Sequence, residues 1–191
     1  DLRTPLTRIK LQLALIGDKE ISKKLSEDID EMEKMLNEYL QFSSSSSTEK
    51  NELFDLSNLI IKIVSKYENS NIKIEQNEKI FFNGRKNLIQ RCLDNLISNA
   101  IKYAEIINIK QEKLKKYIFI TIDDNGPGIP EKEYENVFKP FYKIDKSRSE
   151  SKSSVGLGMS IASDIVKSHG GSIILDKSPK NGLRVKVIFP F

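Results

Sequence analysis

The first part of the chain repeats apolar residues at alternating steps of four and three. This heptad spacing aligns the apolar side chains along one seam of a packed helix. Gly17-Asp18 interrupts the repeat, so the pattern predicts a helical hairpin over residues 1–42. One hairpin cannot bury both seams alone, so we expect a homodimer in which two hairpins form a four-helix bundle. The seam positions are Leu2, Leu6, Ile9, Leu13, Ile16, Leu25, Ile29, Met32, Leu36 and Tyr39.

The start of the hairpin, residues 1–6, allows two interpretations. In the first, Thr4 is an N-cap and Pro5 is the first residue of the helix. In the second, a longer helix begins before residue 1 and kinks at Pro5, so that Asp1 and Thr4 lie about one turn apart on one face. Spacing alone favours the N-cap. The chain begins without an initiator methionine, so we expect it to be part of a longer protein.

A polar, low-complexity run follows the hairpin. Residues 43–47 are all serine and Thr48 follows, so this run can neither continue the apolar seam nor contribute to a core. We therefore expect a linker over residues 43–50 and a second domain over residues 51–191.

The second domain shows both strand and helix patterns. Runs rich in β-branched and aromatic residues predict strands, and apolar residues at helical spacing predict helices. Three helices are expected to lie on a mixed, mostly antiparallel sheet, which makes this domain a two-layer α/β sandwich and the whole chain α+β. The expected strands are 53–56, 72–75, 79–82, 105–110, 117–123, 172–176 and 183–189; the three helices are 57–69 with Ser57 as N-cap, 85–104 and 156–168, and a further short helix is expected at 131–137.

Composition narrows the class of protein. Of 191 residues, 38% are hydrophobic and 30% are charged, and the net charge is +4, which is typical of a soluble globular protein. No basic run with interleaved aromatic residues stands out, so we expect no nucleic-acid partner. No apolar run approaches the roughly 18 residues of a membrane span, so we expect any membrane attachment to lie outside this chain.

The single cysteine and the single histidine are both expected to be structural. Cys92 lies in the apolar stripe of the helix at 85–104, where we expect a buried, inert thiol. One cysteine cannot form an internal disulfide, which fits a reducing compartment. His169 directly precedes Gly170 at a helix end, where we expect it to cap the helix.

Asp124 ends an apolar strand and is followed by Gly126 and Gly128. The Asn-Gly and Pro-Gly pairs here also mark ordinary turns, so the stretch by itself fits either a turn or a site. In a site, the carboxylate would accept a hydrogen bond from an exocyclic amine, and the glycines would let the backbone approach a flat ring.

Asn95, Asn99 and Lys102 lie at i, i+4 and i+7 and share one face of their helix. This face could be a solvated edge, although asparagine is only a mediocre helix former. Alternatively, the amide oxygens would suit a hard cation and the ammonium would suit a phosphate. On this interpretation Asn99 is the candidate ligand of a magnesium ion.

Gly156-Leu157-Gly158 opens a helix, where free N–H groups and the helix dipole favour phosphate. The preceding segment, 143–155, is long, polar and basic, and it has the character of a lid. Its Lys143 and Arg148 would neutralise phosphate charge. Together with the two preceding stretches, these features predict a nucleoside-triphosphate site, and the lack of a Walker-type loop argues against a P-loop fold.

In order and spacing, these motifs resemble the N, G1, F and G2 boxes of sensor histidine kinases. The resemblance covers essentially the whole chain. Residues 1–9 resemble the segment directly after the phospho-accepting histidine, most closely in the osmosensor EnvZ type, and this favours the long helix kinked at Pro5. The box residues are Asn95, Asn99, Lys102 and Tyr103 (N), Asp124, Gly126 and Gly128 (G1), Phe138 and Phe141 (F), and Gly156, Leu157 and Gly158 (G2).

The resemblance implies a Bergerat-type ATP-binding domain that uses ATP and Mg2+. The γ-phosphoryl group would pass to a histidine just upstream of Asp1 and then to an aspartate of a response regulator, which the protein would also dephosphorylate. The resemblance places the protein at the cytoplasmic face of the plasma membrane. Arg3, Arg8 and Lys10 are the candidates for recognition of the response regulator.

The resemblance also implies residue roles in nucleotide binding. Asp124 would read the adenine amine, and Asn99 would ligate Mg2+. Asn95 and Lys102 would support the phosphates, and Tyr103 would pack near the base.

Further roles concern the lid and the phosphotransfer chemistry. Phe138 and Phe141 would anchor the lid, from which Lys143 and Arg148 would contact phosphates. Asp1 would act as the base that polarises the acceptor imidazole, and Thr4 would position water for dephosphorylation.

The chain departs from the family pattern in several places. The acceptor histidine is not in this chain, so we expect ATP binding without self-phosphorylation. Ser154 stands where the first G2 glycine is expected, and the lid is longer than expected. Two alternatives stay open: a non-kinase ATPase of the same fold, as in the chaperone, gyrase and mismatch-repair group, and a non-enzymatic nucleotide-binding dimerisation module.

Overall fold

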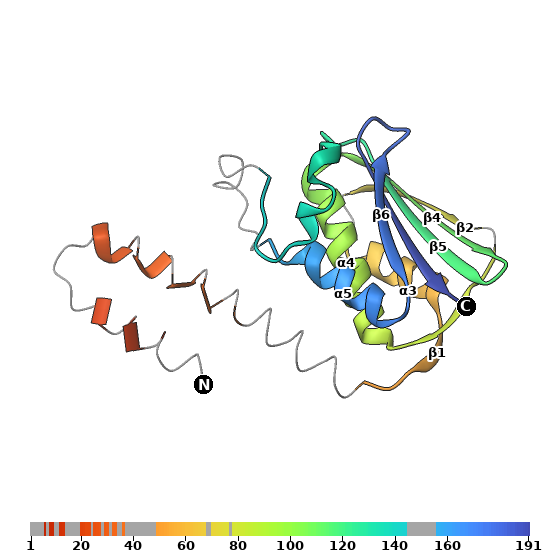
Figure 1. Ribbon diagram of the computed structural model, residues 1–191, viewed down its shortest axis with the longest axis horizontal. Helices are drawn as coiled ribbons and strands as arrows, with labels where there is room; N and C mark the ends of the chain where they lie inside the picture. The colour runs from red at the N-terminus through yellow and green to blue at the C-terminus, as the bar shows by residue number, and fades with distance from the viewer. Residues whose placement is uncertain are drawn as a thin grey trace. The chain divides into compact units, whose positions relative to one another are not determined.

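A computed structural model describes residues 49–67, 70–76, 78–144 and 156–191, together with scattered positions between 6 and 36 (Figure 1). The chain divides into two compact units, with residues 1–48 in one and the described residues from Glu49 onward in the other. Asp1, Thr4, Arg148 and Ser154 lie outside the described residues, so the expectations for them stay predictions.

In the first unit, the described positions between 6 and 36 are helical. Leu13 and Ile29 of the expected seams are buried, whereas Ile9, Leu25 and Met32 are 42%, 40% and 56% exposed. These positions do not define a hairpin or a four-helix bundle, and both stay predictions.

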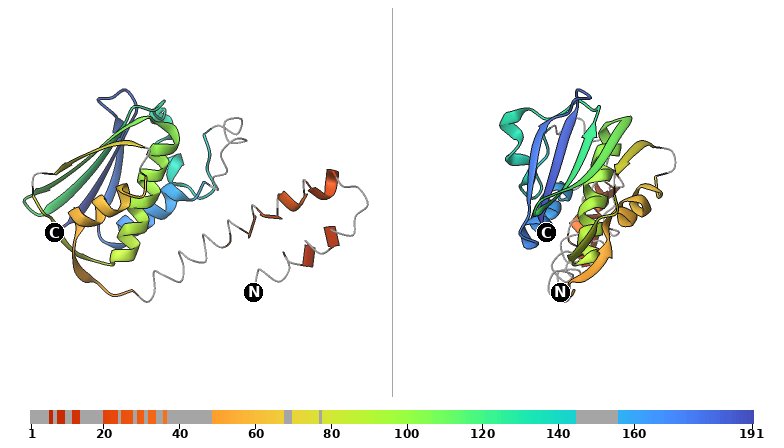
Figure 2. Two further views of the ribbon diagram at one scale, coloured as in Figure 1. Left: turned by 180° about the vertical axis from the view of Figure 1, so that it is seen from behind. Right: turned by 90° about the vertical axis from the view of Figure 1, so that its right-hand side faces the viewer.

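The second unit has two layers. Three helices lie on one face of a five-stranded sheet whose order is β2-β4-β5-β7-β6 (Figures 1 and 2). Only the β2–β4 pair is parallel, so the expected mixed, mostly antiparallel sandwich is confirmed. The sheet strands are β2 (Asn71–Gln76), β4 (Ile106–Leu114), β5 (Tyr117–Asp124), β6 (Ser172–Lys177) and β7 (Leu183–Pro190), and the helices are α3 (Leu56–Val64), α4 (Lys86–Tyr103) and α5 (Gly158–Ser168).

Two short strands form a sheet of their own. β1 (Glu52–Asp55) pairs antiparallel with β3 (Phe81–Gly84), so neither strand joins the main sheet. The Asp55 side chain accepts a hydrogen bond from the Asn58 N–H at 2.9 Å and is therefore the N-cap of α3. The prediction of Ser57 as N-cap is wrong, because the Ser57 hydroxyl is buried and accepts the Ile80 N–H instead.

The segment at 131–137 is also not the single helix that was expected. It forms two 3-10 turns, η1 (Glu131–Glu133) and η2 (Asn136–Phe138). The Asn136 amide and the Tyr142 hydroxyl both donate to the Glu133 carboxylate, and these contacts hold the compact turns together.

The core lies between the helices and the sheet. The apolar stripe of α4 is almost fully buried, and Cys92 lies within it as expected. Burial raises the pKa of the Cys92 thiol to about 12, so this thiol stays protonated and unreactive at neutral pH. The alternate residues of β4, β5 and β7 that face the helices are buried as well, which leaves one face of each strand for polar residues.

Candidate functional site

Asp124 is held in place by the backbone at the end of β5. The residue is 6% exposed, and its Oδ1 accepts the Gly126 N–H at 2.8 Å and the Leu183 N–H at 3.0 Å. The second oxygen, Oδ2, accepts no hydrogen bond from the described residues. The side chain is therefore oriented by one oxygen and keeps the other for a donor such as an amine.

Gly182 explains how β7 approaches Asp124 so closely. A Cβ atom at Gly182 would lie 2.3 Å from Asp124 Oδ1 and 2.4 Å from its carbonyl oxygen, so any side chain there would displace the carboxylate. Gly182 was not among the site residues expected from the sequence. The missed signal was Gly182 directly before a strand, where a close backbone approach is a common reason for glycine.

The two glycines after Asp124, Gly126 and Gly128, are required for different structural reasons. Gly128 has φ +68, which glycine adopts at little cost. Gly126 faces the carbonyl of Tyr103 at the end of α4, where an added Cβ would lie 2.8 Å from the oxygen. Gly126 is thus needed for packing inside the protein, in addition to the expected approach of a flat ring.

The junction between α4 and β5 contains a residue that sequence analysis missed. The Asn125 side-chain oxygen accepts the N–H groups of Glu105, at 3.0 Å, and Ile106, at 2.8 Å. These contacts join the segment that follows α4 to the G1 loop, and the Tyr103 carbonyl and Asp124 Oδ1 both lie next to Gly126. Tyr103 itself is 50% exposed, and Lys102 Nζ lies 5.2 Å from the centroid of its ring.

Asn95 faces the start of α5. Its Nδ2 atom is buried and has no hydrogen-bond partner, and a Cβ at Gly158 would lie 3.9 Å from its Oδ1. A buried amide without a partner costs free energy unless a ligand satisfies it. Asn99, one turn further along α4, is partly exposed. The N and G2 boxes therefore meet at a point where a hydrogen-bond acceptor, such as a phosphate oxygen, would satisfy the Asn95 amide.

The F and G2 boxes also meet. The Phe141 N–H donates to the Gly156 carbonyl at 3.0 Å. Gly156 has φ +79, and an added Cβ would lie 3.0 Å from the Phe141 carbonyl carbon. Phe141 itself has φ 65 and is 54% exposed, so its ring does not pack in the core. The two ends of the expected lid are thus joined by a backbone contact.

The remaining expected site residues lie near these contacts in the sequence. Leu157 is buried just before α5, and Phe138 and Lys143 are partly exposed. Arg148 lies outside the described residues. The described residues contain no cluster of three or more histidine, cysteine, aspartate or glutamate side chains that would hold a metal ion. Amide oxygens such as that of Asn99, together with phosphate oxygens, form a donor set that suits a magnesium ion.

Arg184 and Asp123 form a further contact next to Asp124, and this contact was not expected from the sequence. The guanidinium donates from Nε and Nη2 to both oxygens of Asp123, at 2.7 and 2.8 Å. The hydrogen bonds to Asp123 raise the pKa of Arg184 above its ordinary value.

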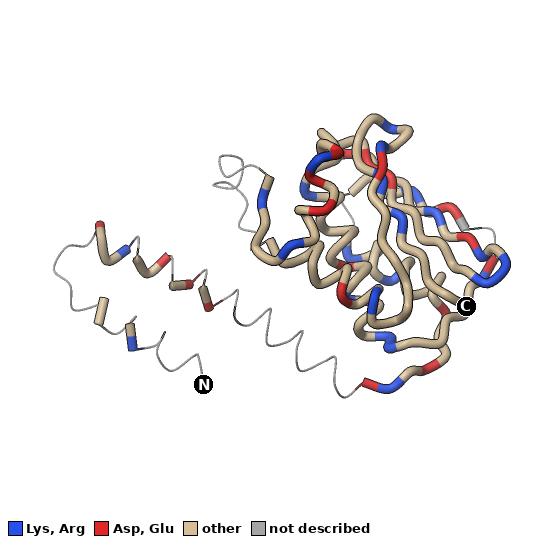
Figure 3. Tube along the Cα trace, viewed as in Figure 1, with Lys and Arg blue, Asp and Glu red and all other residues tan. Residues whose placement is uncertain are grey.

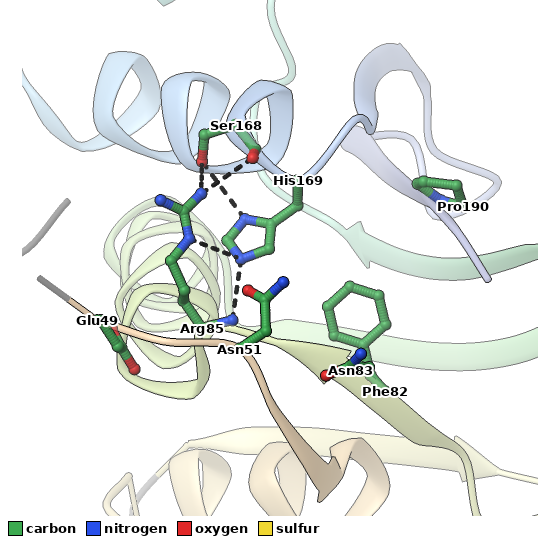
Figure 4. A pocket seen from close by; sticks show the side chains of 8 residues that line it. All are labelled: Glu49, Asn51, Phe82, Asn83, Arg85, Ser168, His169 and Pro190. Carbon is green, nitrogen blue, oxygen red and sulfur yellow. Dashed lines mark hydrogen bonds between the residues drawn. The ribbon is translucent and has the colours of Figure 1, made fainter. Parts of the chain in front are cut away.

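A separate polar pocket lies at the other ends of α4 and α5 (Figure 4). His169 follows α5, and its Nε2 accepts the Arg85 N–H at 3.1 Å while Nδ1 lies 2.8 Å from the Ile165 carbonyl. Nδ1 therefore carries the proton, and the expected capping role is accompanied by a link from α5 to the start of α4. Glu49 also lines this pocket and accepts the Asn87 N–H in the first turn of α4.

Comparison with known proteins decides the family. Residues 84–191 match the family model for histidine kinase-, DNA gyrase B- and HSP90-like ATPases. The chain belongs to this ATPase family. The expected Bergerat-type fold of the second domain is thereby confirmed.

Sensor histidine kinases are among the proteins that this chain resembles in sequence. The chain is 32% identical to the sensor histidine kinase GtrS of Pseudomonas aeruginosa and 29% identical to CpxA of Escherichia coli. All of this chain aligns, but it spans only 40% and 45% of those proteins. The expected resemblance to a sensor histidine kinase is confirmed, although these matches do not single out the EnvZ type.

Solved structures agree on the fold. The catalytic domain of histidine kinase ThkA superposes with a TM-score of 0.66 at 28% identity, over 74% of this chain and 95% of that one. The histidine kinase AdeS of Acinetobacter baumannii gives a TM-score of 0.66 at 23% identity, over 99% and 96% of the two chains. Among the described residues, no helix is both long and apolar enough to cross a membrane.

Proposed function

We propose that this chain is the dimerisation, phosphotransfer and ATP-binding part of a sensor histidine kinase. The proposal assigns residues 1–42 to the phosphotransfer hairpin, 43–50 to a linker and 51–191 to the catalytic domain. The observation that carries the nucleotide site is the pair of unsatisfied groups at its two ends: Oδ2 of Asp124, and the buried Nδ2 of Asn95. The first accepts a hydrogen bond from a ligand and the second donates one.

The spacing of these groups fits an extended nucleotide. Asn95 and Tyr103 are eight residues apart on α4, which corresponds to about 12 Å along the helix axis. The Asp124 end would take the adenine amine, with Tyr103 beside the base. The Asn95 and Gly158 end would take the phosphates, with Lys102, Lys143 and Arg148 neutralising their charge.

Asn99 would hold the magnesium ion, which supplies charge neutralisation at the phosphates when bound. The protein residues would otherwise position the reactants and exclude water, as phosphoryl transfer requires. Phe138 and Phe141 would anchor the lid, and the contact between Phe141 and Gly156 supports this role because it closes the base of the lid.

The phosphoryl acceptor would be a histidine directly before Asp1 in the longer protein. Asp1 would hold the acceptor imidazole in its nucleophilic form, and Thr4 would position water for dephosphorylation of the response regulator. The exposure of Ile9, Leu25 and Met32 in a single chain supports a homodimer, because a second hairpin would cover these apolar side chains. We place the protein at the cytoplasmic face of the plasma membrane, with any membrane-spanning anchor in segments other than these residues.

Calorimetric titration with Mg-ATP tests the nucleotide site. Asp124→Asn should weaken binding by about 1.5–3 kcal/mol, the range for a hydrogen bond to a charged group. The matched control is Asp164→Asn, which removes an exposed carboxylate on α5. Unchanged affinity in Asp124→Asn would exclude the proposed adenine contact.

A second experiment separates the kinase from a non-kinase ATPase. A longer form of the protein that includes the residues before Asp1 would be incubated with radiolabelled ATP, and the acid lability of the label would be measured. An acid-labile, base-stable phosphoryl group indicates phosphohistidine. Steady ATP hydrolysis with no labelled protein would favour the ATPase alternative.

A further inference from the structure

The turn between β4 and β5 carries a basic and apolar cluster, here called the hairpin tip (residues 113–117; Figure 3). Lys115 and Lys116 form the two-residue turn, and Leu114 and Tyr117 are the last strand pair before it. Leu114 is 56% exposed and Tyr117 is 50% exposed. A protruding turn with large apolar side chains and lysines side by side is amphipathic, and such surfaces mark interaction sites.

The backbone of the tip is unfavourable for the residue that occupies it. Lys115 has φ 54, in the left-handed region that glycine, asparagine and aspartate normally fill in two-residue hairpin turns. A lysine at this position costs conformational free energy and adds nothing to the core. A local rule that is broken without a packing gain is expected at functional positions.

The positive charge of the tip is not cancelled within the protein. Among the described residues, Lys113, Lys115 and Lys116 make no ion pair. The neighbouring carboxylate on β4, Glu112, is already paired with Lys110 at 2.8 Å. The tip therefore presents three uncompensated positive charges beside its apolar side chains.

Aromatic rings extend the cluster onto the open face of the sheet. Lys113 Nζ lies 3.1 Å from the centroid of the Phe191 ring, and the Phe191 N–H donates to the Lys116 carbonyl. Lys186 Nζ lies 4.7 Å from the Phe119 ring, which in turn lies 6.4 Å from Tyr117. None of the labelled helices of the second unit covers this face of the sheet (Figure 2), and Tyr117 and Phe191 are 50% and 58% exposed.

We propose that the hairpin tip binds the surface of a lipid bilayer that contains anionic headgroups. Lysines next to an anionic leaflet gain electrostatic free energy, and Leu114 and Tyr117 would enter the boundary between headgroups and acyl chains. Lysine stems can lie along the apolar side chains while the ammonium groups reach the headgroups. A single-stranded nucleic acid fits less well, because stacking needs open ring faces and a lysine already lies over Phe119 and over Phe191.

Binding at the tip would leave the nucleotide residues accessible. Tyr117 and Asp124 are the first and last residues of β5, so the tip and Asp124 are about 23 Å apart at the rise of an extended strand. Docking would therefore fix the orientation of the catalytic domain against a membrane without covering its site. The proposal does not depend on kinase activity.

Co-sedimentation with vesicles tests the proposal. The protein is mixed with vesicles of phosphatidylserine and phosphatidylcholine, and with vesicles of phosphatidylcholine alone, at low and physiological salt. We expect binding only to the anionic vesicles, weakened by salt. The variant Lys115→Gly/Lys116→Asn should bind about 25-fold more weakly, at about fivefold for each lysine near an anionic surface.

This variant also controls for misfolding. Glycine suits the left-handed φ at position 115, so its melting temperature should equal or exceed that of the parent protein. The matched control is Lys62→Gln/Lys167→Gln, which removes the same charge from exposed positions on α3 and α5. Its vesicle binding should stay close to that of the parent.

Three outcomes would overturn the proposal. The first is no binding to anionic vesicles at low salt, and the second is equal loss of binding in both double variants. The third is tighter, tip-dependent binding to single-stranded oligonucleotides than to anionic vesicles, which would identify a nucleic acid as the occupant.

Discussion

Arg184 of β7 and Asp123 of β5 form a bidentate ion pair directly beside the contact between Leu183 and Asp124. The four residues lie on two adjacent antiparallel strands, so the ion pair and the Leu183 hydrogen bond fix the same end of the strand pair. Because Asp124 takes its orientation from the Leu183 N–H, the ion pair supports the geometry of the proposed adenine contact.

Removing the arginine should therefore lower the stability of the fold. Arg184→Leu leaves Asp123, which is 8% exposed, without its partner. We expect a loss of about 1–3 kcal/mol in the free energy of unfolding, less than for a fully buried pair because the arginine is partly exposed. Urea unfolding measures this loss. The double variant Asp123→Leu/Arg184→Leu should recover part of the stability, and a double variant less stable than Arg184→Leu would contradict the explanation.

Asn95 should lower the stability of the ligand-free protein and strengthen the binding of Mg-ATP. Its buried Nδ2 has no partner, so Asn95→Leu, which has a similar shape, should leave the ligand-free protein as stable as before or more stable by about 1 kcal/mol. The same change should weaken Mg-ATP binding at least tenfold. Thermal unfolding with and without Mg-ATP measures both effects, and a destabilised variant that still binds normally would refute the assignment.

Substitution by alanine should have different effects on stability at two glycines near the site. Gly182→Ala places a methyl group 2.3 Å from Asp124 Oδ1, so we expect a loss of about 2 kcal/mol or more in stability. At Gly158, by contrast, the nearest contact is 3.9 Å and the residue begins a helix, so Gly158→Ala should fold normally.

Gly158→Ala should nevertheless change the affinity for Mg-ATP. The methyl group of Gly158→Ala faces Asn95, where the phosphates are proposed to lie, and should reduce Mg-ATP affinity in a protein of unchanged melting temperature. Calorimetric titration and thermal unfolding of both variants check this contrast. Normal affinity in Gly158→Ala would move the proposed phosphate position away from α5.

Protonation of His169 should weaken the fold at mildly acidic pH. Burial lowers the pKa of His169 below its usual 6.5, and the nearby Arg85 charge adds to this effect. The folded state therefore binds fewer protons than the unfolded state, so stability is full above about pH 6.5 and falls as the pH drops towards the lowered pKa. A protonated Nε2 would also face the Arg85 N–H with a second donor.

Urea unfolding at several pH values tests this expectation. Between pH 7.5 and 5.5, the parent protein should lose more stability than His169→Gln, which has no titrating group at that position. Equal losses in both proteins would assign the pH dependence to other groups.

The residues with candidate chemistry could be predicted from the sequence because each prediction depends only on residues close by in the chain. The strand-end carboxylate with its glycines, the asparagines at helical spacing and the buried Cys92 each follow from a period or a turn propensity within one segment. The two wrong assignments, Ser57 as N-cap and one helix at 131–137, depended on partners. Ser57 is held by the backbone of Ile80, and the 131–137 segment by a hydroxyl from Tyr142.

The amino-acid sequence by itself determined the order of the elements, the two-layer class of the second domain and the residue types of the nucleotide boxes. Only the tertiary structure decided that Leu183 would orient Asp124, that Arg184 would pair with Asp123, and that Gly158 would face Asn95. These contacts join segments 59 or more residues apart. Strand register and helix packing select such partners, and neither is visible in the periodicity of a single segment.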